Sequence, residues 1–85
     1  MKEIEVGVVQ DYFAKIGVAA VEITAHGIAI GDEIHFKGHT TDYCQLVDSL
    51  QVKHTEVAEV SAGASVGTKV RDRVRAGDVV FKVVD

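Results

Sequence analysis

Apolar residues recur at every second position along most of this chain, and this period of two constrains the fold more than any other feature. Ile4, Val6 and Val8 share one face of the first run, with Glu3 and Glu5 opposite. Similar runs follow at 17–23, 28–36, 44–52, 65–70 and 79–84. Such alternation is typical of β-strands, and valine, the commonest residue, packs well on a pleated surface. The sequence therefore predicts an all-β fold.

Glycines punctuate these runs, and two of them form Gly-Asp turn signals at 31–32 and 77–78. Six or so short strands separated by turns indicate a small barrel or a small sandwich. A flat open sheet would leave long apolar edges, which closure removes. We therefore predict one domain over residues 1–85, folded as a small six-stranded closed barrel of the Greek-key type.

The stretch 27–38, GIAIGDEIHFKG, predicts a β-hairpin that turns at Gly31–Asp32. Its flanking strands would direct Ile30, Ile34 and Phe36 into the core. The Asp32 carboxylate is expected to accept a backbone N–H and stabilise the turn. In the segment 44–52, Val47 and Leu50 lie three positions apart, so a bulge near Asp48–Ser49 is expected to turn both inward.

Composition adds several exclusions. The single cysteine, Cys44, cannot form an internal disulfide, and the N-terminal MKEIEVGVVQDY lacks the apolar region of a signal peptide. Every apolar run is far shorter than the roughly 20 residues that span a bilayer. We therefore expect a cytoplasmic protein without a membrane segment.

Four motifs, taken in order along nearly the whole chain, carry a family likeness: VGVVQDYFAKIGVAAVEI, GIAIGDEIHFKG, VSAGASVGTKV and VRAGDVVFKV. Together they resemble the second domain of translational GTPases such as elongation factor Tu. The resemblance implies an elongation-factor-type barrel. In the larger factors that barrel contacts RNA or ribosomal components.

A closer likeness covers VGVVQDY, GDEIHFKG and the polar stretch TTDYCQLVDSL. These segments resemble the barrel at the C-terminus of collagenase-like peptidases and the stand-alone translation elongation factor-like proteins. We identify the chain with the stand-alone group.

Nucleotide binding is not expected, despite the fragment GASVGTK at 63–69. Its spacing departs from a P-loop, and the surrounding pattern predicts a strand where a P-loop requires a helix. We therefore predict neither GTP nor any other cofactor.

A metal site is also not predicted. His35, His39 and Cys44 form the pattern H-x3-H-x4-C, whose residue types bind zinc. Residues four apart on a strand diverge, however, and no second pair of ligands follows. The alternative is a solvent-facing His35, a loop His39 and Cys44 as a small core residue.

The basic residues Lys69, Arg71, Arg73 and Arg75 are the candidate nucleic-acid contacts. Residues 1–60 carry ten acids and four bases, whereas residues 61–85 carry three acids and five bases. On one regular strand the four cations would share a face and could follow a phosphate backbone. Asp72 would then point inward, so a break near 71–73, with Asp72 capping it, is the alternative. The cations would then form a solvated edge.

The polar loop 38–45, GHTTDYCQ, supplies the candidate partner-binding residues His39, Thr40, Thr41 and Tyr43. Loops at barrel ends often carry function, and Tyr43 could stack on a base or fill a partner's pocket. The alternative is that Tyr43 closes one end of the barrel.

These observations predict a non-enzymatic binding module, because no activated nucleophile, metal set or carboxylate pair stands out. Our first hypothesis is a contact with RNA or a ribosomal component through residues 69–75. The second is a protein-interaction domain that acts in trans with a collagenase-like peptidase or another enzyme.

Overall fold

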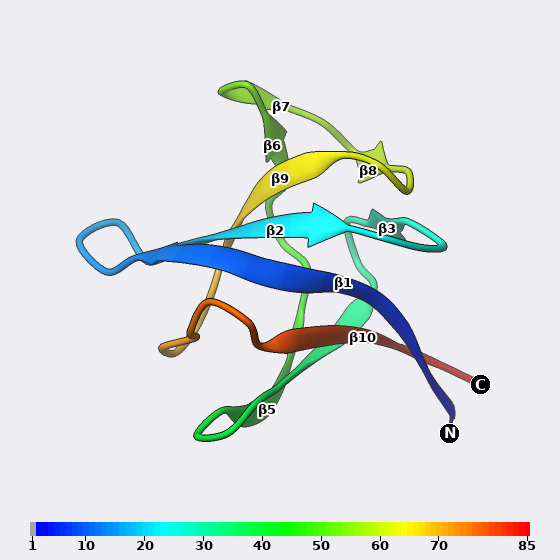
Figure 1. Cartoon of the computed structure of the whole chain (residues 1–85). Coiled ribbons are helices and arrows are strands. Elements are labelled where there is room, and N and C mark those ends of the chain that lie inside the picture. The colour runs from blue at the N-terminus through cyan, green and yellow to red at the C-terminus, as the bar shows by residue number, and fades with distance from the viewer. Residues whose placement is uncertain (1) are drawn as a thin grey trace.

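The computed structural model describes residues 2–85, which form ten β-strands and no helix (Figure 1). The predicted all-β class is confirmed. None of the described residues belongs to a helix that could cross a membrane. The strands are β1 (Lys2–Phe13), β2 (Val18–Ile23), β3 (Ile28–Ala29), β4 (Glu33–Lys37), β5 (Asp42–Leu46), β6 (Gln51–Val52), β7 (Thr55–Glu56), β8 (Glu59–Val60), β9 (Ser65–Lys69) and β10 (Val79–Val84).

Eight strands form one antiparallel sheet in the order β5-β4-β10-β1-β2-β9-β6-β7, and β3 pairs with β8 in a second, two-stranded sheet. The predicted closed six-stranded barrel is not confirmed, because the large sheet ends in two edges, at β5 and β7. β5 nevertheless approaches the end of β9. There the Gln45 side chain donates to Lys69 O over 2.8 Å and accepts from Arg71 N–H over 2.8 Å. Side-chain hydrogen bonds therefore link β5 to the end of β9, where a closed barrel would have backbone hydrogen bonds between the two strands.

The core follows from the alternation along the strands. Ile34 and Phe36 of β4 and Val80 of β10 are buried, while Glu33 and Lys37 at the two ends of β4 face solvent. The core is completed by Val6, Val9, Ala19, Val21, Ile23, Ile28, Val47, Leu50, Val66 and Val74. A register shift between Glu5 and Gly7 interrupts the alternation along β1. As a result the next buried valine after Val6 is Val9, whereas uninterrupted alternation would bury Val8.

The hairpin predicted for 27–38 is only half correct. Gly31, with φ +94°, makes the turn, and Asp32 Oδ2 accepts Ala29 N–H over 2.8 Å, as expected. The two flanking strands do not pair with each other, however. β3 joins β8, whereas β4 joins β5 and β10. As a result Ile30 is 45% exposed rather than part of the core.

The segment 44–52 is interrupted rather than bulged. β5 ends at Leu46, and the chain resumes strand geometry only at β6. In between, Val47 N–H donates to Asp32 O and Val47 O accepts from Gly31 N–H, both over 2.8 Å. Because this stretch is irregular, both Val47 and Leu50 are buried. The predicted bulge was expected to have the same effect.

Candidate docking groove

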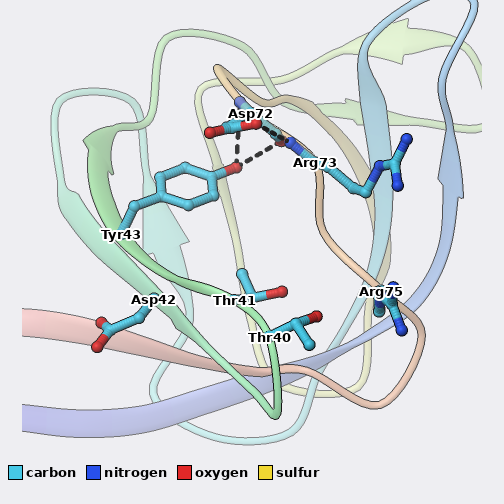
Figure 2. Close-up of a pocket in the computed structure, with 7 residues that line it drawn as sticks. All are labelled: Thr40, Thr41, Asp42, Tyr43, Asp72, Arg73 and Arg75. Atoms are coloured by element: carbon cyan, nitrogen blue, oxygen red, sulfur yellow. Dashed lines mark hydrogen bonds between the residues drawn. The ribbon is translucent and has the colours of Figure 1, made fainter.

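The two segments singled out separately in the sequence meet around one polar hollow of 360 Å³ (Figure 2). One side is the turn between β4 and β5 with the start of β5, and the other is the 70–78 loop between β9 and β10. We call this hollow the groove. Its lining residues are Thr40, Thr41, Asp42, Tyr43, Asp72, Arg73 and Arg75.

The groove lies at the end of the sheet farthest from the two termini (Figure 1). The turn between β1 and β2 is at the same end, because Val70 N–H donates to Gly17 O over 2.9 Å. Three connections therefore gather there, at 14–17, 38–41 and 70–78. Such connections can vary without disturbing the strands that carry them, and they often bear binding residues.

Tyr43 holds the two sides of the groove together. Its hydroxyl donates to Asp72 O over 2.7 Å and accepts from Asp72 N–H over 3.4 Å (Figure 2). Its ring packs on Phe36, with centroids 5.4 Å apart, and the Arg71 guanidinium carbon lies 5.4 Å from its centroid. Burial raises the pKa of the phenol. Tyr43 thus closes one end of the fold, which was the alternative to base stacking.

The turns on both sides are fixed by buried polar groups. Thr41 is buried and its carbonyl accepts Gly38 N–H over 2.8 Å. The buried Asp78 carboxylate accepts Arg75 N–H over 2.8 Å, which is the turn role that Asp32 has in the first Gly-Asp turn. Asp78 also lies against Gly38, where any Cβ would collide with its Oδ1 atom. Glycine at position 38 lets the two turns approach.

The four predicted cations do not form a stripe. β9 ends at Lys69, and Arg71, Arg73 and Arg75 lie in the loop that follows. The alternative of a break is confirmed, since Asp72 Oδ1 accepts Arg73 N–H over 2.7 Å and caps the bend. Arg71 is occupied internally, because its guanidinium donates to Cys44 O over 2.8 Å.

Arg73 and Arg75 are the exposed cations left at the groove. Among residues 2–85 the ion pairs are His35 with Glu3, His35 with Asp42, and Lys82 with Asp32. Neither groove arginine takes part in them. The Thr40 and Thr41 hydroxyls point toward the side where these arginines lie, whereas the Asp42 carboxylate points away (Figure 2). The groove therefore offers two guanidinium groups beside hydroxyl groups, with the Asp72 carboxylate also in its lining.

The other predicted site residues fall outside this arrangement. Lys69 and His39 are exposed and do not line the groove. The expectation that Cys44 is a core residue is wrong, because it is partly exposed on β5, opposite His35 of β4. Burial, with the nearby charges of Glu33, Glu3 and Asp42, raises the pKa of its thiol.

Sequence reasoning missed Gln45 as the residue that joins β5 to the end of β9. The one indication in the sequence is the alternation along β5. Asp42, Cys44 and Leu46 face outward, so Gln45 places an amide side chain on the inward face. An amide there can donate and accept at once, which is what bridging two backbone segments requires.

Comparison with known proteins finds relatives among peptidases. The chain is 37% identical over 94% of its length to an uncharacterized protease of Methanocaldococcus jannaschii, and 32% identical over 95% to a collagenase of Porphyromonas gingivalis. It spans about a fifth of the length of these curated relatives, 20% of each. No protein-family model matches the chain.

Solved structures agree on the fold. Two crystal structures of the C-terminal domain of a U32 peptidase from Geobacillus thermoleovorans superimpose with TM-scores of 0.86 and 0.85. They cover 93% and 91% of this chain, at 21% and 20% identity. In each case the match also covers over nine tenths of the solved domain, at 91% and 96%.

These findings confirm the resemblance to collagenase-like peptidases and correct the other one. The interpretation as an elongation factor-like protein of protein biosynthesis is wrong, because the relatives are a protease and a collagenase. Binding to RNA or the ribosome is no longer supported, because that expectation rested on the resemblance to elongation factors. Gly-Asp turns between short apolar strands occur in many small β folds, so these motifs could not separate the two families.

Proposed function

We propose that this chain is a non-catalytic protein-interaction domain that works with the catalytic part of a collagenase-like peptidase. The relatives contain a region similar to this chain within a protein about five times longer. The solved structures comprise the corresponding C-terminal domain alone. A unit of this kind can associate with the rest of a peptidase either within one chain or as a separate protein.

The groove carries this proposal. Arg73 and Arg75 form no ion pair within residues 2–85, although the chain as a whole has a net charge of −4. A guanidinium binds a carboxylate through two parallel hydrogen bonds, and neighbouring hydroxyls can add to them. We infer that the groove receives a carboxylate-bearing segment of the partner, with the exposed Thr40 as a further donor.

Exposed apolar residues next to the groove's end of the sheet favour a protein partner over a small anion. Phe13 is 47% exposed and Ile16 is 68% exposed, and both line a shallow apolar hollow with Val18. Large apolar side chains gathered on a surface are a common mark of protein interfaces. Because the 14–17 turn contacts Val70, one partner could cover this hollow and the groove together.

The non-catalytic character is supported by what surrounds the candidate nucleophiles. The groove lining contains two threonine hydroxyls but no histidine or lysine that could serve as their base. Burial, together with the nearby acids, raises the pKa of the Cys44 thiol and so disfavours the thiolate that a nucleophile requires.

Size-exclusion chromatography tests the proposal with a U32-type peptidase from the same organism, prepared with and without its C-terminal domain. This chain should co-elute with the truncated peptidase. It should not co-elute with the full-length enzyme if the enzyme's own domain occupies the same position. Failure to bind either form would overturn the proposal.

A further inference from the structure

Three potential metal ligands converge on the outer face of the large sheet. One ligand atom each from Glu3, His35 and Cys44 lies within 4.8 Å of the other two. They come from β1, β4 and β5, so residues far apart in the sequence meet at one place. Nothing in the proposed function uses this cluster.

The register of the sheet creates the cluster. Cys44 of β5 is directly opposite His35 of β4, and His35 is opposite Phe81 of β10. Glu3 of β1 lies one strand further, where it pairs with Val83. Since the neighbours Ile34 and Phe36 are buried, the side chains that alternate with them must point to the opposite face.

His35 is already oriented by two carboxylates. Its Nδ1 lies 2.8 Å from Glu3 Oε2, and its Nε2 lies 2.5 Å from Asp42 Oδ1. The side chain is only 13% exposed, and the Phe81 ring packs nearby with centroids 6.2 Å apart. The imidazole is therefore held in one orientation, with its Nδ1 directed at Glu3.

We propose that Glu3, His35 and Cys44 form a Zn²⁺ site. Imidazole nitrogen, carboxylate oxygen and thiolate sulfur are the three donor types that zinc binds, and three protein ligands leave one position for water. The ion takes the place of the proton between His35 Nδ1 and Glu3, and Cys44 binds as a thiolate after releasing its proton to solvent. Zinc–ligand bonds are about 2.0–2.3 Å long. Binding would therefore move Glu3 Oε2 and His35 Nδ1, now 2.8 Å apart, slightly away from each other, while Cys44, whose sulfur lies within 4.8 Å of both, approaches the ion.

Asp42 acts as the positioning residue of this site. A histidine that binds zinc through one ring nitrogen usually donates its other N–H to a carboxylate, which fixes the ring and increases its basicity. Asp42 already accepts from Nε2 in this way. The sequence pattern H-x3-H suggested His39 as the partner of His35. The structure instead brings in Glu3, which lies on another strand and is distant in sequence.

Cobalt replaces zinc as a spectroscopic probe for the test. CoCl₂ is titrated into the purified, chelator-treated chain, and the absorption spectrum is recorded before and after addition of ZnCl₂. We expect one Co²⁺ per chain, a thiolate-to-cobalt charge-transfer band, and loss of that band when zinc displaces cobalt. Absence of a thiolate band at saturating cobalt would overturn the proposal.

Variants assign the ligands. Cys44→Ser should remove the charge-transfer band, and Glu3→Gln, at a more exposed position, should weaken cobalt binding at least tenfold. Asp42→Asn should weaken it by about 10–100-fold while the band remains. His39→Ala is the matched control and should bind cobalt like the parent. Folding of each variant is checked by circular dichroism. Retention of the band in Cys44→Ser, or an equal loss in His39→Ala, would contradict the assignment.

Discussion

Gly38 is the residue on which the shape of the groove depends most. A side chain at this position would collide with Asp78 Oδ1, and Asp78 cannot move aside freely because it is buried and its other oxygen accepts Arg75 N–H. We predict that Gly38→Ala lowers the free energy of unfolding by about 1–3 kcal/mol, the usual cost of overpacking, as measured by urea denaturation.

Gly67→Ala is the control for this prediction. A Cβ at position 67 would meet Val18 Cγ1 at 3.5 Å, an ordinary contact, and Gly67 is not among the glycines with positive φ. Its stability should stay equal to that of the parent or rise by up to about 1 kcal/mol. Equal losses in the two variants would show that the Asp78 contact is not the cause.

His35 should make the stability of the metal-free protein depend on pH. Its hydrogen bond to Asp42 raises the pKa of the imidazole, against the effect of burial and with the help of Glu3. A folded-state pKa above the unfolded value of about 6.5 means that the protonated form stabilises the fold. This contribution is complete below that value and is lost as pH rises through the folded pKa.

Urea denaturation in chelator across this pH range measures the effect. The parent should lose stability as pH rises above about 6.5, and His35→Ala should show a flatter profile. His39→Ala, at an exposed position on the neighbouring turn, should retain the parent's profile. A parent profile that rises with pH in this range would have the wrong sign for the two carboxylate contacts.

The β6–β7 turn is the element with the clearest mismatch between sequence and backbone. Its two central residues, Lys53 and His54, both have positive φ, at 50° and 66°. Two-residue hairpins of this geometry strongly prefer Asn-Gly. We predict that Lys53→Asn with His54→Gly raises the free energy of unfolding by about 0.5–2 kcal/mol. A decrease in the melting temperature of the double variant would contradict this interpretation.

The junction between β5 and β9 depends on one side chain. Gln45 provides both a donor and an acceptor to the backbone there. Gln45→Ala should therefore cost about 1–3 kcal/mol in urea denaturation, because polar backbone groups lose their partners. Leu46→Ala, at a side chain that is 63% exposed, should change stability by less than about 0.5 kcal/mol. A similar loss in both would argue against the junction.

The elements that alternation predicted well are those whose pattern is local. β4 and β10 appear where apolar residues alternate, and the Gly31–Asp32 turn is correct. What alternation could not predict is which strands pair. β3 pairs with β8 and not with β4, because strand pairing depends on contacts between residues that are here about 30 positions apart. The closed barrel is not confirmed for the same reason, since whether β5 and β9 would pair was not encoded in either strand alone.

At the scale of the whole molecule, the groove combines segments whose separate roles the sequence indicated only in part. Thr40, Thr41 and Tyr43 were candidates from a polar loop, and Arg73 and Arg75 from a basic run. Their meeting depends on the curl of the sheet, which no motif specified. The sequence also could not distinguish Arg71, which is bound to Cys44 O, from the two arginines that remain exposed.

Association of this chain with the catalytic part of a collagenase-like peptidase is tested most directly by calorimetric titration with the truncated peptidase. The parent should bind, and Arg73→Glu with Arg75→Glu should weaken binding at least tenfold, because two like charges would then face the partner's carboxylates. The matched control, Lys2→Glu with Lys69→Glu, changes the net charge by the same amount on exposed residues that line neither the groove nor the apolar hollow, and it should bind within about threefold of the parent. Equal affinity of the parent and the Arg73→Glu, Arg75→Glu variant would contradict docking through the groove, and absence of heat with the parent would contradict the association itself.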